Sequence, residues 1–574
     1  KHVRWEAMSY FAEGKPGVDL MKVRAALDQF ASGAKGLELS VFQDVARTGE
    51  RLFDLSLLAT VPDPNKYVEA NLKQLIPQFE KHPELGSHRA SYAVEQWLNF
   101  FSGVDGAEPM VRVVTARFGR PNLHVQVTEE LLNHTTTRPV SEVRPVKQCI
   151  LGTSVSGTGD TQGWLNVSLM PSVGSARLLF QMSGDTYSST VGVNGPARIR
   201  SAGTTNFNGN KMVQLTRESF GTSPATFSAA TQTQTKSVSS RVGGLVGMFV
   251  APIARQRVAQ QKRQAEAIAS DLAERDLTDE FNRSVIEQVG IARGAFEHRV
   301  PLPFRRYRAE PRQLIFGTTS DDLSMEVLHA ARGQLGAPDS PPPAPRRAMS
   351  LRLHQSGANN LAAMLLSGAT LSQKKEDQPP KLSVVLPDWA KQLATRAQQR
   401  AATKPAKESK DDEEPEFKPW ELTLRRGRPL SFEFVDGALE VSIHAAQLVS
   451  YDGDDRDTFD NWDIVVRFEP ALVDGKWVLS RVGKIDALPT SFDPDEGKPL
   501  NSRYLPVRNN LIAVLNESVS REGLPQELPL RPIPLRDNRG ELEAREVAAA
   551  GGWLTVGWDL VKYLGATGGV ALTN

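Results

Sequence analysis

The feature that most constrains this fold is a junction between two long stretches of different periodicity. Residues 145–240 are rich in Thr, Ser, Val and Gly, and apolar side chains alternate with polar ones, as at Leu165, Val167 and Leu169 of "WLNVSLMP". Such alternation predicts antiparallel strands with one face on a core and the other in water. Residues 253–299 then place apolar residues at three- and four-residue steps, which predicts one long amphipathic helix.

The predicted helix carries its apolar residues in two consecutive stripes. Ile268 and Leu272 belong to the first stripe, and Phe281, Val285 and Val289 belong to the second. The opposite face is rich in Arg, Gln, Glu and Asp. A helix of this length can bury such stripes only against another extended element, and we expect the preceding sheet to be that partner.

Two further regions have a clear period. Residues 1 to about 105 predict helices, because large apolar residues fall on one helical face: Val68, Leu72, Leu75 and Phe79, then Val94, Trp97, Leu98 and Phe101. Near the C-terminus, "PLSFEFVDG", "ALEVSIHAAQLVSY" and "NWDIVVRFEP" alternate instead. Asp-Gly turns in "VDGA" and "VDGK" complete the pattern of a second antiparallel β region.

These patterns predict the α+β class: a helical N-terminal region followed by two antiparallel β regions packed on long helices. A proline-rich segment between them cannot hold regular structure. A charged segment is expected to be mobile, with a short helix at 387–400 as a candidate element. The expected divisions are a helical region 1–105, a sheet with its long helix 106–336, a proline-rich linker 337–349, a strand-helix joint 350–372, a charged flexible linker 373–418 and the second β region 419–574.

Composition limits the classes of partner. The 574 residues carry a formal net charge of +1, so no overall field attracts nucleic acid, and we expect none as a partner. Any electrostatic function is therefore local. The single cysteine, Cys149, lies beside Ile150 and Leu151, and we expect it to be a small buried apolar residue.

Location and membrane contact follow from the first residue and the apolar segments. The chain starts with Lys1 rather than Met, so we expect that a signal peptide is missing and that the protein is periplasmic, in the cell envelope or extracellular. No run of about 18 apolar residues predicts a spanning helix. The segment "GLVGMFVAPIA" (244–254) is expected in a core, with shallow insertion into a bilayer as the alternative.

Motifs for catalysis are absent from the sequence. It contains no nucleophile elbow, phosphate-binding loop or zinc-protease helix, so it favours a non-enzymatic protein and predicts no catalytic residue. The segment "YDGDDRDTFDNWD" (451–463) clusters carboxylates that would attract calcium, although a solvated hairpin tip explains the same residues. No other cofactor is expected, and the candidate calcium ligands are Asp452, Asp454, Asp455 and Asp457.

A basic segment, "PFRRYRAEPR" (303–312), interleaves arginine with aromatic residues. Guanidinium groups suit phosphate and lipid headgroups, which makes an anionic headgroup site one interpretation. A surface β-segment whose arginine stems cover apolar neighbours is the alternative. The candidate headgroup residues are Arg305, Arg306, Arg308 and Arg312.

The segment "LRLHQSGANNLAAMLL" (351–366) changes from strand spacing to helix spacing. We expect Asn359 and Asn360 to satisfy backbone groups at this reversal, because an amide has no pKa useful for acid–base catalysis. Structural roles are also expected for His354 and His444, which lie on strand-like runs.

Three segments together resemble uncharacterised exported proteins of planctomycete-type bacteria: "VTEELLNHTTTRPVSEVRPVKQCILGTSVSGTG", "TVGVNGPARIRSAGTTNF" with the long helix, and "LRLHQSGANNLAAMLLSGATL". The resemblance covers roughly residues 120–560 and implies no assigned activity. In the order of its elements, the twisted sheet with a long helix, a pattern that the sequence indicates twice, also resembles the TULIP superfamily of lipid-binding tubes. That resemblance implies an apolar groove between helix and sheet that holds acyl chains, and it transfers no site residue.

We therefore expect a non-enzymatic envelope protein that binds a lipid or another apolar ligand between the long helix and its sheet. The candidate groove residues are Ile268, Leu272, Phe281, Val285 and Val289. A membrane surface is a further expected partner, and the oligomeric state is not indicated. Two alternatives stay open: a structural or interaction protein of the cell surface that holds no ligand, and a hydrolase whose residues converge only in three dimensions.

Overall fold

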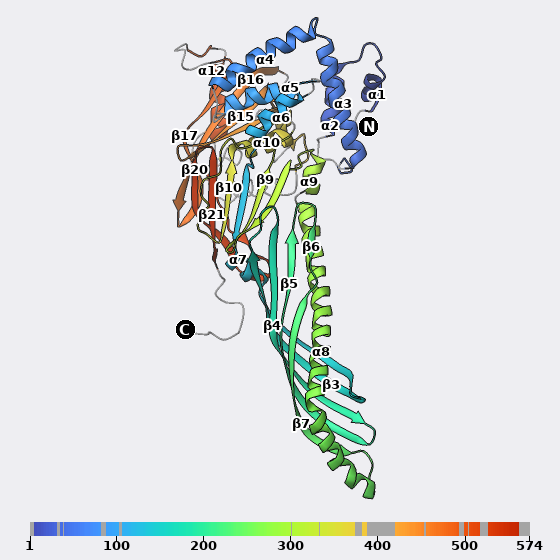
Figure 1. Ribbon diagram of the computed structural model, residues 1–574. Coiled ribbons are helices and arrows are strands. Elements are labelled where there is room, and N and C mark those ends of the chain that lie inside the picture. Colours follow the sequence, from blue (N-terminus) through green and yellow to red (C-terminus); the bar gives the residue numbers. More distant parts are fainter. Residues whose placement is uncertain are drawn as a thin grey trace.

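The N-terminal helices lie at one end of an elongated molecule, and a long sheet with one long helix extends away from them (Figure 1). The computed structural model describes residues 5–30, 35–37, 39–81, 88–102, 106–299, 301–331, 333–373, 381–386, 419–452, 455–492, 499–502, 504–516 and 526–561. Within these ranges the chain forms three antiparallel sheets and a set of helices, which confirms the predicted α+β class.

The N-terminal region is helical, as predicted. Its helices are α1 (Trp5–Ala12), α2 (Leu20–Gln29), α3 (Ser40–Ala59), α4 (Pro64–Lys81), α5 (His88–Phe101) and α6 (Glu108–Arg117). Helices α1 to α3 pack around Val23, Leu27 and Phe30. Both predicted stripes of α4 and α5 form a second core that also includes Phe118.

The central sheet combines strands from distant parts of the chain. In the described residues its order is β19 (Ile533–Pro534), β20 (Glu541–Ala550), β21 (Trp553–Val561), β10 (Met349–His354), β1 (Leu123–Thr128), β9 (Asp322–Leu328) and β8 (Gln313–Thr318). Helix α7 (Glu129–Thr136) follows β1, helix α10 (Gln355–Leu366) follows β10, and a 3-10 turn (Arg536–Asn538) precedes β20. The N-cap of α7 is Thr128, whose hydroxyl accepts from the Leu131 amide.

The second sheet is built from the C-terminal β region. In the described part of the chain its order is β12 (Lys381–Leu382), β11 (Thr370–Gln373), β13 (Trp420–Leu424), β15 (Ala438–Asp452), β16 (Asp455–Val473), β17 (Lys476–Pro489) and β18 (Glu527–Pro529), and β14 (Leu430–Val435) also pairs with β15. One face carries a core that includes Phe434, Trp462 and Ile464. Helix α12 (Leu505–Asn516) packs against this core.

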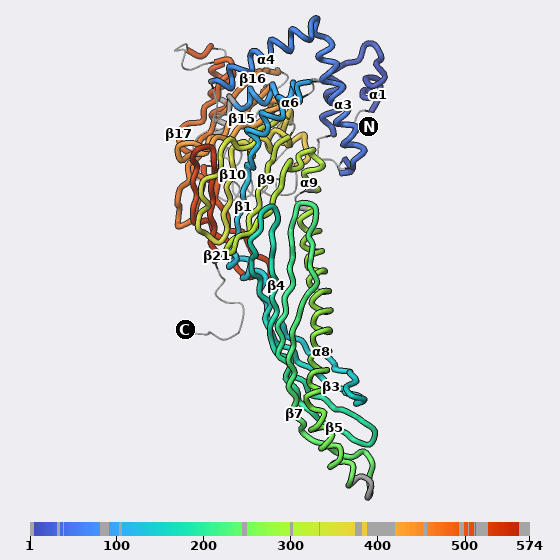
Figure 2. The backbone as a smooth tube through the Cα atoms, viewed as in Figure 1, coloured from blue at the N-terminus to red at the C-terminus, as the bar shows by residue number. Residues whose placement is uncertain are grey.

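The third sheet is the long one, and we call it the distal sheet. Its described strands are β2 (Arg138–Ile150), β3 (Thr153–Met170), β4 (Ala176–Asn194), β5 (Ala197–Leu215), β6 (Phe220–Thr222) and β7 (Thr226–Ser240). Helix α8 (Gly244–Arg299) then runs back along it for 56 residues, followed by α9 (Pro301–Arg306). Figure 2 shows the long strands and α8 lying side by side along the extended part of the molecule. The predicted partnership of long helix and sheet is therefore confirmed.

The inward face of the distal sheet changes character along its length. Near the central sheet it is apolar, with Val167, Leu178 and Val213 packed against α8. Farther out the inward positions are mostly Gly, Thr and Ser. At Gly163 and Gly184 a Cβ would lie 2.6 and 2.2 Å from the backbone oxygen of the neighbouring strand, so only glycine allows the strands to approach this closely.

Two expectations about buried residues are wrong. Cys149 is exposed, because it lies on the outward face of β2, the strand at the edge of the distal sheet. Within the apolar segment 244–254, the described side chains do not form a core: Phe249 is 70% exposed and Ile253 66% exposed. Since α8 begins beyond the last paired residues of the sheet, no strand in the described part of the chain covers its first turns. The side chains of residues 244–248 lie outside the described part of the structure.

Candidate functional site

The five predicted groove residues occupy two different environments between α8 and the distal sheet. Phe281 and Val285 are each only 6% exposed, and Val289 packs against the same core. The Phe281 ring meets the Phe227 ring edge-on, with centroids 5.4 Å apart. Ile268 and Leu272 are half-buried and belong to the part of α8 that faces Gly and Thr. Around Phe281, Val285 and Val289, protein side chains therefore fill the space between α8 and the sheet.

An amphipathic hollow, which we call the proximal cavity, lies where α8 ends beside the central sheet. Its volume is about 380 Å³. Its apolar lining includes Phe220 and Phe296, whose ring centroids are 5.5 Å apart. The complete lining is Arg217, Glu218, Ser219, Phe220, Arg293, Phe296, Glu297, His298, Leu302, Arg305, Glu310, Pro311 and Leu314.

Charged groups surround the apolar part of the proximal cavity. Arg293 pairs with Glu297 at 2.8 Å, and Arg305 pairs with Glu310 at the same distance. The guanidinium of Arg217 instead donates to the backbone oxygens of Pro311 and Arg312, at 3.3 and 2.9 Å. Because carbonyl groups carry no net charge, Arg217 keeps its full positive charge for an anionic group.

The four arginines of the predicted headgroup site do not act together. Arg305 lines the proximal cavity, whereas Arg306, Arg308 and Arg312 do not. Arg308 pairs at 2.6 Å with Glu50 of α3 and so joins the N-terminal helices to the end of α9. The headgroup assignment stays a prediction, and the structure places only Arg305 next to an apolar hollow.

The opposite end of the distal sheet carries charges of one sign. We define the distal tip as residues 146–156, 189–201 and 236–263, which surround the turns between β2 and β3, between β4 and β5, and between β7 and α8. Its sequence contains no Asp or Glu. Its charged residues are all basic: Lys147, Arg198, Arg200, Lys236, Arg241, Arg255, Arg257, Lys262 and Arg263.

The distal tip also exposes apolar side chains. Val242 is 48% exposed, and Phe249 and Ile253 on the first turns of α8 are more exposed still. Large apolar side chains gathered among basic residues are typical of segments that insert shallowly into a bilayer. Among the helices in the described ranges, none combines the length and apolar character that crossing a bilayer requires.

The predicted calcium site lies largely outside the described residues. Asp454 is not described, and of Asp452 and Asp455 only the backbone is. Asp457 is exposed on β16. Among the described residues, no three His, Cys, Asp or Glu side chains gather as a metal-binding group. The calcium site therefore stays a prediction.

A polar relay, which the sequence did not reveal, crosses the second sheet. The Ser431 hydroxyl lies 2.7 Å from Nε2 of His444, and Nδ1 of His444 lies 2.7 Å from Oδ1 of Asp463. With the proton on Nδ1, His444 donates to Asp463 and accepts from Ser431. Burial raises the pKa of Asp463, but the hydrogen bond from His444 and the charge of Arg425 together lower it. The carboxylate therefore stays ionised.

The relay of Ser431, His444 and Asp463, which we call the serine relay, is connected like the triad of a hydrolase, but its serine is not exposed as the serine of such a triad is. A nucleophilic serine must reach its substrate, whereas Ser431 is only 1% exposed. Neither the proximal cavity nor the second cavity described below includes it. No local sequence pattern could have found the three residues, because only strand register aligns His444 with Asp463 and β14 with β15.

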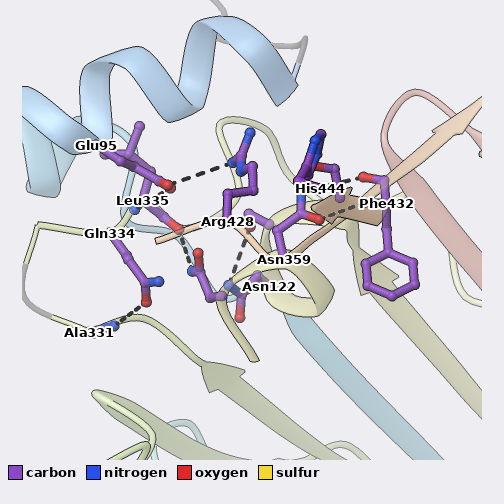
Figure 3. Close-up of polar contacts among 12 residues, drawn as sticks. Glu95, Asn122, Ala331, Gln334, Leu335, Asn359, Arg428, Phe432 and His444 are labelled. Atoms are coloured by element: carbon purple, nitrogen blue, oxygen red, sulfur yellow. Dashed lines mark hydrogen bonds and ion pairs between the residues drawn. The ribbon is translucent and has the colours of Figure 1, made fainter. Parts of the chain in front are cut away.

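A second polar group joins the N-terminal helices to both neighbouring sheets (Figure 3). Glu95 of α5 accepts from the Leu335 amide at 3.1 Å and lies 3.6 Å from the guanidinium of Arg428. Asn359 of α10 bonds both backbone groups of Phe432, and Asn360 donates to the carbonyl oxygens of His329 and Leu335. We call this set the polar junction.

The polar junction confirms a structural role for Asn359 and Asn360 but corrects how they act. They do not cap the strand-to-helix reversal, because both lie inside α10 and point toward other segments. The N-cap is His354, whose Nδ1 accepts from the Ser356 amide at 3.1 Å. Its structural role is as predicted.

Together these features define a class: an elongated α+β protein in which one long helix lines a curled antiparallel sheet, with an amphipathic cavity at one end and a basic, apolar tip at the other. Among solved structures it is similar to a lipopolysaccharide binding protein (11% identity, TM-score 0.22, covering 77% of this chain and 99% of that one). It is also similar to P47 from Clostridium botulinum A2 (9%, 0.21, 77% and 98%) and to P47 of Clostridium botulinum E1 (8%, 0.23, 77% and 100%).

At these TM-scores the likenesses carry no argument about function. The sequence matches no protein-family model and no curated protein. The resemblance to exported planctomycete-type proteins therefore stays a prediction.

Proposed function

We propose that this protein binds lipid at a membrane surface, with its distal tip docked on a bilayer that contains anionic lipids. The observation that carries the proposal is the charge of the tip. The whole chain has 68 basic and 67 acidic residues, yet all charged residues of the distal tip are basic. Such a local imbalance attracts the tip to an anionic surface even though the protein as a whole is almost neutral.

The docking combines two favourable terms. Each Lys or Arg close to an anionic bilayer contributes about 1 kcal/mol of attraction, which salt weakens. Phe249 and Ile253 then leave water for the boundary between headgroups and acyl chains, which adds the hydrophobic term. The remaining turns of α8 hold the other end of the molecule away from the surface (Figure 1).

The proximal cavity supports a second element of the proposal, the binding of an amphiphile. Its aromatic lining at Phe220 and Phe296 suits an acyl chain, and Arg217 suits an anionic group. We therefore propose that the apolar ligand binds at the end of α8 rather than along the packed interface around Phe281. We further propose that the protein is exported to the cell envelope, which fractionation of native cells with an antibody would test.

Co-sedimentation with vesicles tests the docking. The full chain should pellet with phosphatidylglycerol/phosphatidylcholine vesicles and not with pure phosphatidylcholine, and added salt should release it. Replacing Arg255 and Arg257 by Gln, or Phe249 by Ser, should weaken binding by about tenfold or more. The matched control replaces Arg531 and Arg536, two exposed arginines outside the tip, by Gln. Equal binding of tip and control variants would overturn the docking proposal.

A fluorescent fatty acid tests the proximal cavity separately. Saturable binding to the full chain should weaken in Arg217→Gln and in Phe296→Ala, whereas Arg255→Gln should leave it unchanged. Lipid extraction and mass spectrometry of protein from its native host provides a second test. Absence of any bound lipid, together with no fatty-acid binding, would favour the alternative of a structural surface protein without ligand.

The serine relay supports hydrolysis as a second candidate function, and the burial of Ser431 argues against it. A fluorophosphonate probe separates these two interpretations, because it labels only a serine that is both activated and accessible. Labelling that disappears in Ser431→Ala would establish a hydrolase. Intact protein that remains unlabelled, with a lower thermal midpoint in Ser431→Ala, would assign the relay a structural role.

A further inference from the structure

A second cavity lies on the polar face of the central sheet, under the proline-rich segment. It has a volume of about 560 Å³, which is the size of a small-molecule site. Its floor is set by strand register, since Ser350 of β10 pairs with Gln126 of β1 on one side and with Gly557 of β21 on the other. We call it the proline pocket, because Ala344 and Pro345 form part of its wall.

The proline-rich segment lies against this sheet face. A Cβ on Gly557 would meet Pro345 at 3.1 Å and Arg347 at 2.8 Å, so only glycine lets the segment come this close. Arg352 of β10 donates to the carbonyl oxygen of Pro342 at 3.0 Å. The segment therefore walls a polar surface that would otherwise be open to water.

Two polar side-chain atoms on this face are buried and have no hydrogen-bond partner among the described residues. Ser350 lines the proline pocket and is only 2% exposed, and its hydroxyl has no hydrogen-bond partner anywhere in the described chain. Two positions along β10, Nε of Arg352 is likewise buried and lacks a partner among the described residues. Buried polar groups in proteins are almost always hydrogen-bonded, so the Ser350 hydroxyl, which lines the cavity, indicates a missing partner there.

The charges of the lining indicate the chemistry of that partner. Arg347 is already paired, with Asp559 at 2.9 Å and Glu546 at 3.5 Å. Arg346, Glu130 and Asp322 also line the pocket, and none of them forms an ion pair within the described ranges. Among the described residues, the pocket thus presents one unpaired cation, two unpaired carboxylates and one hydroxyl without a hydrogen-bond partner. A purely anionic ligand would be repelled by the carboxylates, and a purely cationic one by Arg346.

We propose that the proline pocket binds a small zwitterion that carries an anionic carboxylate or phosphate and an ammonium group. The anionic group takes the Ser350 hydroxyl and Arg346 as partners, and the ammonium group takes Glu130 and Asp322. This chemistry occurs both in free amino acids or short peptides and in the phosphoethanolamine headgroup of lipids. The proposal is independent of membrane docking, because no residue of the distal tip contributes to the pocket.

Calorimetric titration of the full chain tests the proposal with alanyl-alanine and glycerophosphoethanolamine as zwitterions, and with acetate and ethylammonium as single-charge probes. At least one zwitterion should bind at one site per chain, and neither single-charge probe should. Alanyl-alanine binding alone would assign a peptide or amino-acid ligand, and glycerophosphoethanolamine binding alone would assign a lipid headgroup. If neither zwitterion binds, the proposal is overturned.

Variants connect the binding to the named groups. Ser350→Ala, Arg346→Gln and Asp322→Asn should each weaken binding by about tenfold or more. The control is Asp339→Asn, an exposed carboxylate of the same segment that does not line the pocket. Ser350→Ala should also leave the thermal midpoint of the free protein unchanged or higher, because it removes an unsatisfied hydroxyl. Unchanged affinity in all three variants would contradict the assignment.

Discussion

Glu274 of α8 accepts a hydrogen bond from the backbone amide of Ala229 on β7 at 2.8 Å. The pattern repeats at every second residue of β7 and every fourth residue of α8. The Thr231 amide donates to Ser270 at 2.9 Å, and the Thr233 amide donates to Glu266 at 2.6 Å. Two strand residues span about 6.8 Å and four helical residues about 6 Å. Helix α8 therefore accepts hydrogen bonds from successive backbone amides along the edge of β7 that no described strand covers.

Removing one of these carboxylates should loosen the β7 edge. Glu274→Ala leaves the Ala229 amide without its acceptor, at a cost of about 1–2 kcal/mol. Amide hydrogen exchange over 227–235 should accelerate, whereas Glu287→Ala, an exposed carboxylate on the same helix, should leave it unchanged. Equal exchange in both variants would mean that packing alone holds α8 to the edge.

Truncation of Phe281 distinguishes a packed core from an open groove. Phe281→Ala should destabilise the protein by about 3–5 kcal/mol, because a buried ring in contact with Phe227 is lost. Ile286→Ala, at a 55% exposed position one turn away, should change stability by less than about 0.5 kcal/mol. Thermal or urea unfolding measures both. A loss in Phe281→Ala as small as in the control would indicate a groove that tolerates empty volume.

The ion pair of the polar junction should hold the N-terminal helices in place. Burial raises the pKa of Glu95, although the charge of Arg428 opposes that effect. Arg428→Met leaves Glu95 buried without its ion-pair partner and should cost about 3–5 kcal/mol. Limited proteolysis should then cut between α4 and α6 more rapidly than in wild type.

The matched tests for the polar junction use one double variant and one surface variant. Glu95→Leu combined with Arg428→Met removes both charges and should recover much of the lost stability. Arg112→Met, at an exposed position on α6, should be neutral. A double variant less stable than Arg428→Met would show that Glu95 contributes mainly through the Leu335 amide.

Acid should destabilise the protein through two buried histidines. Burial lowers the pKa of His329 and of His354 from 6.5 to about 4. Between pH 6.5 and pH 4 the unfolded state therefore binds more protons than the folded state, so stability present above pH 6.5 is lost as the pH falls. Each histidine contributes up to about 3 kcal/mol of this loss.

Unfolding free energies measured between pH 7 and pH 4 test this dependence. His354→Asn retains a capping acceptor for the Ser356 amide but cannot be protonated, so it should flatten the curve. His134→Asn is the control, because this histidine is only half-buried. A pH dependence that is identical in His354→Asn and wild type would rule out His354 as a contributor.

The sequence by itself determined the elements whose signal is local. Helical spacing predicted the cores of α4 and α5, and alternation predicted the strands of the distal sheet. The length of the 253–299 stripe required an extended partner, which is why the pairing of α8 with that sheet could be predicted. The basic character of the distal tip was also present in the sequence, but only the turns of the sheet bring its three segments together.

Tertiary structure decided everything that depends on contacts between distant segments. The central sheet joins β1, β9, β10 and β21, and no local pattern specifies which distant strand will pair with which. Strand register in the second sheet places Ser431 beside His444. In the central sheet, Ser350 lies in a cavity lined by Pro345 and has no hydrogen-bond partner among the described residues. Local periodicity reports only which face of an element is apolar, whereas the energy of a buried polar group depends on the neighbours that folding brings to it.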